Sequence, residues 1–341
     1  MKNSLKIILY ITLLSKICSA QDQNFSQFYE LPLLRNPALA GLFKGDVQAT
    51  AAYRSQWQAV TQPYVTQALG LEMKFAANQN SDNYLAVGCQ FTNDLAGDSK
   101  FGKTQVLPTF TFHKALSEDK DTYLSLGFMG GIVQQRFDAT NLSFDDQFVN
   151  GNYSSTNPTK QTFSNSNVTY VDGGVGLVFS STLANEVKYY VGAAMFHINS
   201  PKVAFNAQND IKLNKKLMIN AGMAAPTSEY DKLIIYADFF KQGGNSQMQG
   251  GLMYKHDLLR QGDEESISLS LGSFLRWNDA VIPMAKLDYY NFGVGVTYDV
   301  NISKLSAASR LRGGYEITMS YRNFLNLRNT SADKTRCPVN F

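Results

Sequence analysis

Long apolar runs are missing from this sequence after residue 20. No stretch there reaches the roughly 18 apolar residues that a transmembrane helix needs. Histidine and cysteine are also scarce, with three of each. None of the histidines has a second histidine at ligand spacing, which excludes an HExxH or His-pair metal site. The chain is nevertheless rich in tyrosine, phenylalanine and glycine.

Net charge is missing as well once residues 1–20 are removed. They contain Lys2, Lys6 and Lys16 and no acid, so 28 basic residues remain against 28 acidic ones. A nucleic-acid partner would require a basic surface, so this balance argues against one. The remaining cysteines, Cys89 and Cys337, are too few for a disulfide framework. One bridge between them is chemically possible, but both are expected to be free.

Residues 1–20 are predicted to be a secretory signal peptide. Lysines precede an apolar run at 7–14, and Cys18-Ser19-Ala20 stands before Gln21. The run is too short for a membrane anchor. Lys16 and Ile17, directly before Cys18, argue against processing as a lipoprotein. The mature chain is therefore expected to be exported.

Alternating apolar and polar residues recur along the mature chain, which predicts β-strands with one apolar face. We expect about 14 strands, an even number, as in outer-membrane β-barrels of a single bacterial chain. They lie near 46–54, 69–75, 85–91, 106–112, 124–132, 171–179, 187–196, 217–223, 233–240, 248–254, 267–275, 281–289, 292–300 and 315–321. The predicted fold is an all-β, transmembrane antiparallel barrel, and a soluble sandwich or propeller is the alternative. The predicted division is a signal peptide (1–20), an N-terminal plug-like segment (21–45), the barrel (46–322) and a periplasmic tail (323–341).

Two further patterns favour the barrel over the sandwich. The longest connections, 137–167 and 199–216, both follow odd-numbered strands, which is where a barrel with periplasmic termini has its outer loops. Charged residues within strands also fall on the predicted inner face, where they avoid the roughly 2–4 kcal/mol cost of Arg or Lys on a lipid face. These residues are Arg54, Glu72, Lys74, Asp172, Asp238 and Asp299.

Several motifs suggest chemistry, and each has a simpler interpretation. Residues 97–104 match the phosphate-loop pattern GxxxxGKT, but 105–113 alternates and contains Pro108, so a strand follows in place of the required helix. We predict a surface turn and no nucleotide. The acidic stretches 118–121 and 145–146 lack calcium-loop spacing and are expected to be solvated turns. A Ser/His/Asp hydrolase using His113 or His197 stays open, although no GxSxG elbow is present; His197 is expected at a strand end near the membrane interface.

The stretch 26–57 contains the strongest local signals. Asn36-Pro37 predicts a helix start, because asparagine caps backbone N–H groups and proline fits the first helical position. Gly41 follows where a left-handed residue would end about one turn. From Asp46 the period changes to two, with Gln48, Thr50, Ala52 and Arg54 on one face.

This stretch also carries a resemblance to a known family. QFYELPLLRNPALAG followed by AAYRSQW resembles the N-terminal signature of the PorP/SprF family of type IX secretion system membrane proteins. Residues 192–201, 294–300, 315–321 and the terminal Cys337-Pro338 with Phe341 resemble the family in the same order. Gly313-Gly314 departs from it, where a Ser-His-like pair is expected. The matched signature positions are Asn36, Pro37, Gly41, Tyr53, Arg54, Gln56, Trp57, Cys337 and Pro338.

The resemblance implies an integral outer-membrane barrel of Bacteroidota that works with the type IX machinery. Members help to export or display cargo such as gliding adhesins, and they are not known as enzymes, so no cofactor and no catalytic residue is expected. The implied partners are outer-membrane lipid, type IX proteins and a secreted adhesin. The signature positions are open to a second interpretation, in which Asn36-Pro37 caps a turn that plugs the lumen and Trp57 anchors the barrel at the membrane interface. An outer-membrane channel or transporter for small or hydrophobic molecules is the alternative function.

Overall fold

The computed structural model describes residues 22–325, except 59–61, 79–80, 98, 118–120, 150, 155, 162, 184–185, 207, 262–263 and 305. The predicted signal peptide, Cys337 and Pro338 lie outside the described residues. Among the described residues, no helix is both long and apolar enough to cross a bilayer.

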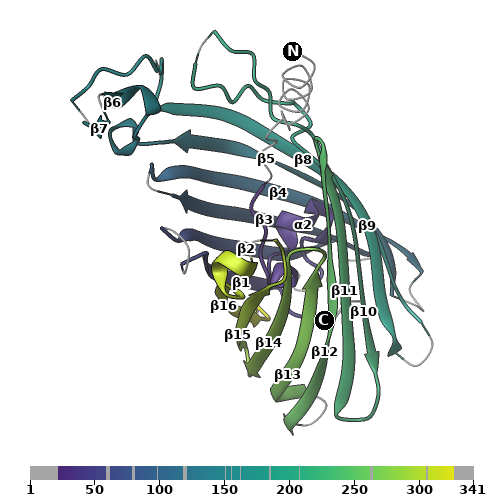
Figure 1. Ribbon diagram of the computed structural model, residues 1–341. Helices are drawn as coiled ribbons and strands as arrows, with labels where there is room; N and C mark the ends of the chain where they lie inside the picture. The colour runs from purple at the N-terminus through teal and green to yellow at the C-terminus, as the bar shows by residue number, and fades with distance from the viewer. Residues whose placement is uncertain are drawn as a thin grey trace, which may run out of the picture.

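Fourteen strands of the described chain close into an antiparallel barrel (Figure 1), which confirms the predicted fold and strand number. Each strand pairs with its sequence neighbours, and β1 pairs with β16 to close the wall. The strands are β1 (Val47–Gln56), β2 (Tyr64–Asn78), β3 (Ser81–Ala96), β4 (Phe101–Ser117), β5 (Thr122–Arg136), β8 (Asn167–Thr182), β9 (Lys188–Phe196), β10 (Lys216–Pro226), β11 (Asp231–Gln242), β12 (Asn245–Gln261), β13 (Glu264–Arg276), β14 (Ala280–Tyr289), β15 (Phe292–Asn301) and β16 (Arg312–Asn323).

The remaining elements are short. The strands β6 (Phe148–Val149) and β7 (Asn152–Tyr153) form a small hairpin between β5 and β8. The helices are η1 (Phe28–Glu30), α2 (Pro32–Arg35), η2 (Pro37–Leu39), η3 (Ala139–Asn141), η4 (Asp145–Gln147) and α3 (Ser306–Ser309).

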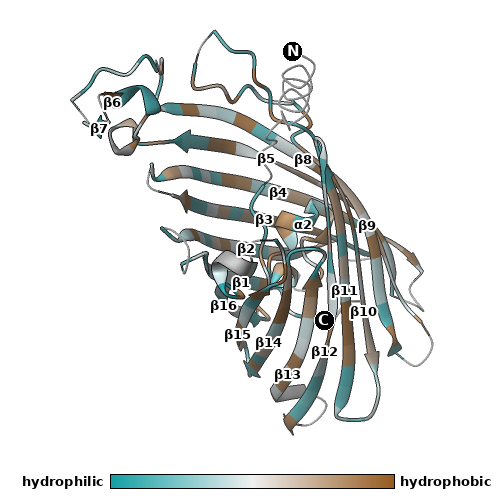
Figure 2. Ribbon diagram, in the orientation of Figure 1, coloured by the Kyte–Doolittle hydropathy of each residue, from teal (hydrophilic) through white to brown (hydrophobic). Residues whose placement is uncertain are grey.

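The wall follows the predicted alternation, and hydrophilic and hydrophobic residues succeed one another along the strands (Figure 2). On β15, Phe292, Val294 and Val296 are exposed, while Thr297 and Asp299 face inward and are buried. All six strand charges predicted to face inward are indeed buried, namely Arg54, Glu72, Lys74, Asp172, Asp238 and Asp299. The charged groups therefore find partners inside the barrel and leave an apolar surface for lipid.

The two ends of the barrel differ in their connections. The long connections 137–166 and 197–215 lie at one end, which we name the loop end. The other end, the turn end, has short connections. β1 begins and β16 ends there, and Asp46 N donates to Asn323 O. In bacterial barrels the short turns face the periplasm, so we expect the loop end to face outward.

Residues 22–45, which we name the N-terminal segment, run through the interior of the barrel. Asp22 contacts strand ends at the loop end, and the segment leaves at the turn end to begin β1. Its apolar side chains are buried against inward side chains of the wall, and together they form the core: Phe25, Phe28, Leu31, Leu33, Ala38, Leu39 and Ala40. The interior is therefore packed around this segment.

Candidate functional site: the seat of the N-terminal segment

The centre of the N-terminal segment is a capped turn, as the sequence predicts. Asn36 Oδ1 accepts a hydrogen bond of 2.9 Å from Ala38 N, and Pro37 begins the one-turn helix η2. Gly41 ends the turn in the left-handed region, at φ +81°. Asn36, Pro37 and Ala38 are buried, so the turn is part of the interior of the barrel.

Three wall glycines form the surface against which this turn packs. A Cβ atom on Gly176 would lie 1.8 Å from Asn36 Oδ1, and one on Gly127 would lie 2.4 Å from Ala38 N. A Cβ on Gly192 would lie 2.8 Å from Asn36 Nδ2. No real Cβ approaches so closely, so only glycine allows the turn to touch strands β5, β8 and β9.

Hydrogen bonds in both directions join the segment to the wall. Asn36 Nδ2 donates to Leu177 O and Ala193 O, at 3.2 Å each. The remaining bonds join Thr111 Oγ1 to Pro37 O (2.7 Å), Asn220 Nδ2 to Arg35 O (3.3 Å), Gly41 N to Glu72 Oε2 (2.9 Å) and Lys74 Nζ to Phe43 O (2.7 Å). A chain that enters a barrel without regular secondary structure must satisfy its buried backbone groups in this way.

His113 is one of these wall residues. It is fully buried, with one ring nitrogen 2.8 Å from Ala40 O and the other 2.7 Å from Ser125 Oγ. The nitrogen beside the carbonyl must carry the proton, so the other accepts from the Ser125 hydroxyl. This pairing ties the backbone of the segment to β4 and β5.

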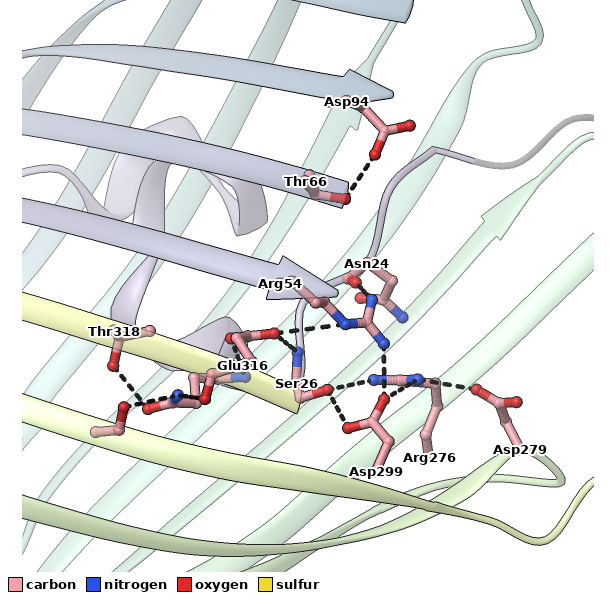
Figure 3. Close-up of polar contacts among 12 residues, drawn as sticks. Asn24, Ser26, Arg54, Thr66, Asp94, Arg276, Asp279, Asp299, Glu316 and Thr318 are labelled. Carbon is pink, nitrogen blue, oxygen red and sulfur yellow. Dashed lines mark hydrogen bonds and ion pairs between the residues drawn. The ribbon is translucent and has the colours of Figure 1, made fainter. Parts of the chain in front are cut away.

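Near the loop end, the beginning of the segment is held by a charged network (Figure 3). Asp299 accepts from Arg54 (2.7 Å), from Arg276 (3.2 Å) and from Ser26 Oγ (2.5 Å). Glu316 accepts from the backbone N–H groups of Ser26 and Gln27, at 2.7 and 2.8 Å. Arg54 also donates to Asn24 O. The wall residues that contact the N-terminal segment are named the seat, and the signature residue Arg54 belongs to it.

The carboxylate of Asp22, the first described residue of the segment, contacts three side chains. Its carboxylate lies 2.9 Å from Lys103 Nζ, 3.7 Å from Lys216 Nζ and 2.7 Å from His197 Nε2, and His197 Nδ1 lies 2.7 Å from Asp172. Burial alone would raise the pKa of Asp22, but the two lysines and His197 bring it well below its usual value. Burial likewise would lower the pKa of His197, but hydrogen bonds to Asp172 and Asp22 raise it to about 9.

His197 corrects one expectation from the sequence. It does follow the end of β9, but it lies inside the barrel with 4% of its surface exposed, and not at the lipid interface. The left-handed backbone at His197, φ +56°, turns the chain inward at this point. Sequence alternation could not show this, because the two acids that hold His197 come from the N-terminal segment and from β8.

Two ion pairs complete the seat. Arg35 donates to both carboxylate oxygens of Asp238, and its guanidinium also lies over the rings of Phe28, Tyr190 and Tyr236. Glu30 accepts from Lys286 Nζ at 2.5 Å. Beside these pairs, towards the turn end, lies a cavity of about 60 Å³. Its lining residues include Tyr29, Glu30, Arg35, Lys286 and Arg322. It is large enough to hold a few waters.

The structure brings together some of the signature residues and separates others. Asn36, Pro37, Gly41 and Arg54 all lie at the seat. Tyr53 faces outward, with its ring 6.1 Å from that of Tyr315. Gln56 and Trp57 lie at the loop end of β1, away from the seat.

The sequence analysis missed the residues that receive the segment. They are Gly127, Gly176, Gly192, Asn220, Glu316 and Lys286, together with Asp22, Glu30 and Arg35 in the segment itself. One signal was available: inward charges in the wall require partners, and the segment contains the charges that match them.

Among the described residues, no group of His, Cys, Asp and Glu could hold a metal ion. The phosphate-loop match is confirmed as a turn, because β3 ends at Ala96 and β4 begins at Phe101. Cys89 is a free cysteine in β3.

Known proteins resemble the chain in sequence pattern and, more weakly, in shape. The family described as type IX secretion system membrane protein PorP/SprF matches residues 17–321. No curated protein is significantly similar to the chain in sequence.

Similar solved structures include the Ralstonia pickettii toluene transporter TbuX, with 9% identity, a TM-score of 0.49, and coverage of 87% of this chain and 94% of that one. The CymD monoaromatic hydrocarbon channel has 12% identity, a TM-score of 0.46, and coverage of 87% and 94%. BamA from Haemophilus ducreyi has 9% identity, a TM-score of 0.42, and coverage of 82% and 70%. Likenesses at this level carry no information about function.

The family match covers the N-terminal segment and nearly the whole barrel. A closed antiparallel barrel with an apolar outer face is one of the two structures that can span a membrane, because it leaves no unpaired backbone in lipid. The protein therefore lies in the outer membrane and belongs to the PorP/SprF family of type IX secretion system membrane proteins.

Proposed function

We propose that this protein is a non-enzymatic accessory of type IX secretion that assists the export or surface attachment of a specific cargo, such as a gliding adhesin. The observation that carries the proposal is the bonding of the N-terminal segment to the wall. Its bonds reach β1, β2, β4, β8, β9, β10, β11, β13, β14, β15 and β16. A lumen filled by a segment bonded in this way suits a fixed platform better than a path for diffusion.

The loop end supplies a surface that suits a protein cargo. Asn165 N donates to Phe205 O at 3.1 Å, which joins the two long connections 137–166 and 197–215. Phe137 packs against both Phe163 and Phe205, with ring centroids 4.9 and 4.8 Å apart. Beyond this contact, Phe148 and Tyr153 of the hairpin β6–β7 remain exposed. Exposed aromatic side chains on a braced loop are typical of protein-binding surfaces.

The proposal assigns the opposite end to the secretion machinery. The turn end faces the periplasm, and its short turns, with the chain that continues beyond residue 325, would contact type IX components there. A contact between the C-terminal tail, with Cys337-Pro338, and these components is part of the same proposal.

Affinity purification of the tagged protein in mild detergent tests the proposal. We expect type IX components and one secreted protein to be recovered with the barrel. Phe148→Ser with Tyr153→Ser should reduce recovery of the secreted protein at least tenfold while type IX components are retained. Tyr230→Ser, which changes an exposed aromatic residue at the turn end, is the matched control. Recovery of the barrel alone would contradict the proposal.

The same preparation separates the alternative functions. A closed accessory should show no steady conductance in planar bilayers and no uptake of small molecules into liposomes, whereas a channel or transporter should show one of them. A hydrolase would lose its activity in His197→Ala. Conductance of the unmodified chain without cargo recovery would favour the channel.

A further inference from the structure

Both tryptophans of the chain lie in neighbouring connections of the loop end. Trp57 follows β1, and Trp277 lies between β13 and β14. The connection between β15 and β16 lies between them: Trp57 N donates to Gly313 O at the start of β16 (2.8 Å), and Ile302 N, directly after β15, donates to Asp279 O (2.8 Å). Tryptophan is enriched at the interface between lipid and water, so this part of the rim has the composition of an interface.

Three exposed cations lie in the same part of the rim. Lys304, Arg310 and Arg312 have no ion pair with any residue that the structure describes. The three neighbouring connections contain one acidic residue, Asp279, which is paired with Arg276 at 2.9 Å. We name this set the rim patch: Trp57, Trp277, Ile302, Lys304, Arg310, Leu311 and Arg312. The apolar members alternate with the cations, and Trp277, Ile302 and Leu311 are about half exposed, at 59%, 48% and 55%.

The height of the rim patch corresponds to the headgroup layer. The lipid-facing aromatic residues Tyr53, Tyr298 and Tyr315 mark the outer end of the apolar band on β1, β15 and β16. Arg312 lies three residues beyond Tyr315, roughly 10 Å along the strand and less along the tilted barrel axis. The polar layer of a bilayer is about 5–8 Å thick on each side, so these cations reach the depth of lipid phosphates.

The opposite wall lacks this arrangement. The connection 137–166 joins β5 to β8, and 197–215 joins β9 to β10, so neither long connection borders β1, β15 or β16 in the barrel. Figure 1 shows the long connection of β6 and β7 standing away from the β15–β16 connection. The rim patch is thus separate from the two long connections.

Two residues of the rim patch have strained backbones. Arg310 and Leu311 both have left-handed backbones, at φ 51° and 66°, which costs a non-glycine residue roughly 1–2 kcal/mol. Hydrogen bonds from Leu311 N to Ser306 O and from Asn301 N to Leu311 O hold them there. The strain keeps an arginine and a leucine exposed side by side.

We propose that the rim patch binds the phosphorylated headgroup of an outer-leaflet lipid. Lys304, Arg310 and Arg312 neutralise the phosphate charge, and the tryptophans with Ile302 and Leu311 contact the boundary between headgroup and acyl chains. The inference depends on the outer-membrane location of the barrel and is independent of its role in secretion.

Titration of the detergent-purified full chain with diphosphoryl lipid A, followed by native mass spectrometry, tests this proposal. A membrane-surface cation contributes about a fivefold effect, so the triple variant Lys304→Gln, Arg310→Gln, Arg312→Gln should bind roughly 100-fold more weakly. Added salt should weaken binding to the unmodified chain and have less effect on the variant.

The matched control removes three exposed lysines from the long connections, as Lys160→Gln, Lys202→Gln, Lys212→Gln. It should bind lipid A within about twofold of the unmodified chain. Equal losses in both triple variants, or no loss in the rim variant, would overturn the proposal. Inorganic pyrophosphate is the test for the source of the phosphate, and binding as tight as that of lipid A would assign the patch to free phosphates. If the triple variant fails to fold, as judged by its mobility in unheated SDS gels, Arg310→Gln alone should show the fivefold loss.

Discussion

Arg35 and Asp238 meet inside the barrel through two parallel hydrogen bonds, 2.8 Å from Nε and 2.6 Å from Nη2. The two residues are 203 positions apart, one in the N-terminal segment and the other in β11. The pair therefore joins the N-terminal segment to the wall through a buried contact of opposite charges.

Breaking this pair should destabilise the protein strongly. Asp238→Ala leaves a buried guanidinium without its counter-charge, which costs about 3–5 kcal/mol. The double variant Arg35→Ala, Asp238→Ala should lose clearly less than the sum of the two single variants. Urea unfolding of the refolded barrel in detergent measures these free energies. Asp210→Ala, which removes an exposed partner of Lys202 and Lys212, should change stability by less than about 1 kcal/mol, and additive losses for Arg35 and Asp238 would contradict the coupling.

Gly176→Ala should displace the N-terminal segment from its seat. The new Cβ would lie 1.8 Å from Asn36 Oδ1, so either the turn or the strand must move. We expect faster proteolysis at Arg35 and the appearance of steady conductance in planar bilayers.

Gly130→Ala is the control for that experiment, because its Cβ would be 3.6 Å from the nearest atom, Asp172 O, at an ordinary contact distance. It tests the general cost of replacing a strand glycine. A closed bilayer recording for Gly176→Ala together with normal protease resistance would show that the turn adapts and that the glycine seat is not required.

The barrel could be predicted from the sequence because its wall is a local, periodic structure. Outward apolar residues such as Phe292, Val294 and Val296 alternate with inward polar ones, and lipid on one side enforces that period over every strand. Asn36, Pro37 and Gly41 were equally predictable, because a cap and a left-handed glycine act within a few residues.

The seat could not be predicted in the same way, because its contacts join distant parts of the chain. Nothing near Gly176 in sequence indicates that Asn36 occupies the space of its missing side chain. His197 likewise lies between Asp22 and Asp172, and only the closed barrel brings these three residues together. Periodicity places His197 at a strand end but does not say whether the chain then turns inward.

The stabilisation that the contact between Asp22 and His197 provides should decrease both at high pH and at low pH. The pKa of His197 is raised from 6.5 to about 9, so its stabilising effect is complete below its unfolded value and is lost as pH rises through about 9. The pKa of Asp22 is lowered, so its effect is present above 3.8 and is lost as pH falls further. Lys103 and Lys216 are further partners of Asp22 and keep part of the contact when His197 is neutral.

The difference in unfolding free energy between the unmodified chain and His197→Gln measures this effect. It should be about 3 kcal/mol at pH 6 and decline towards pH 10, because a glutamine cannot carry the charge. Asp231→Asn, next to the exposed His256, serves as the control and should show no such decline. A difference that stays constant from pH 6 to pH 10 would mean that His197 is held by packing and not by its charge.

Trp57 and Trp277 should report the depth of the loop-end rim directly, because they are the two tryptophans of the chain. In each of the variants Trp57→Phe and Trp277→Phe, the fluorescence comes from the remaining tryptophan. If both lie at the headgroup boundary, lipids brominated near the headgroup should quench each more strongly than lipids brominated near the chain end. Trp277 is 59% exposed and lies within reach of lipid at this height. Quenching by aqueous acrylamide alone would place the rim above the membrane, and the basic residues beside it would then face water in place of lipid phosphates.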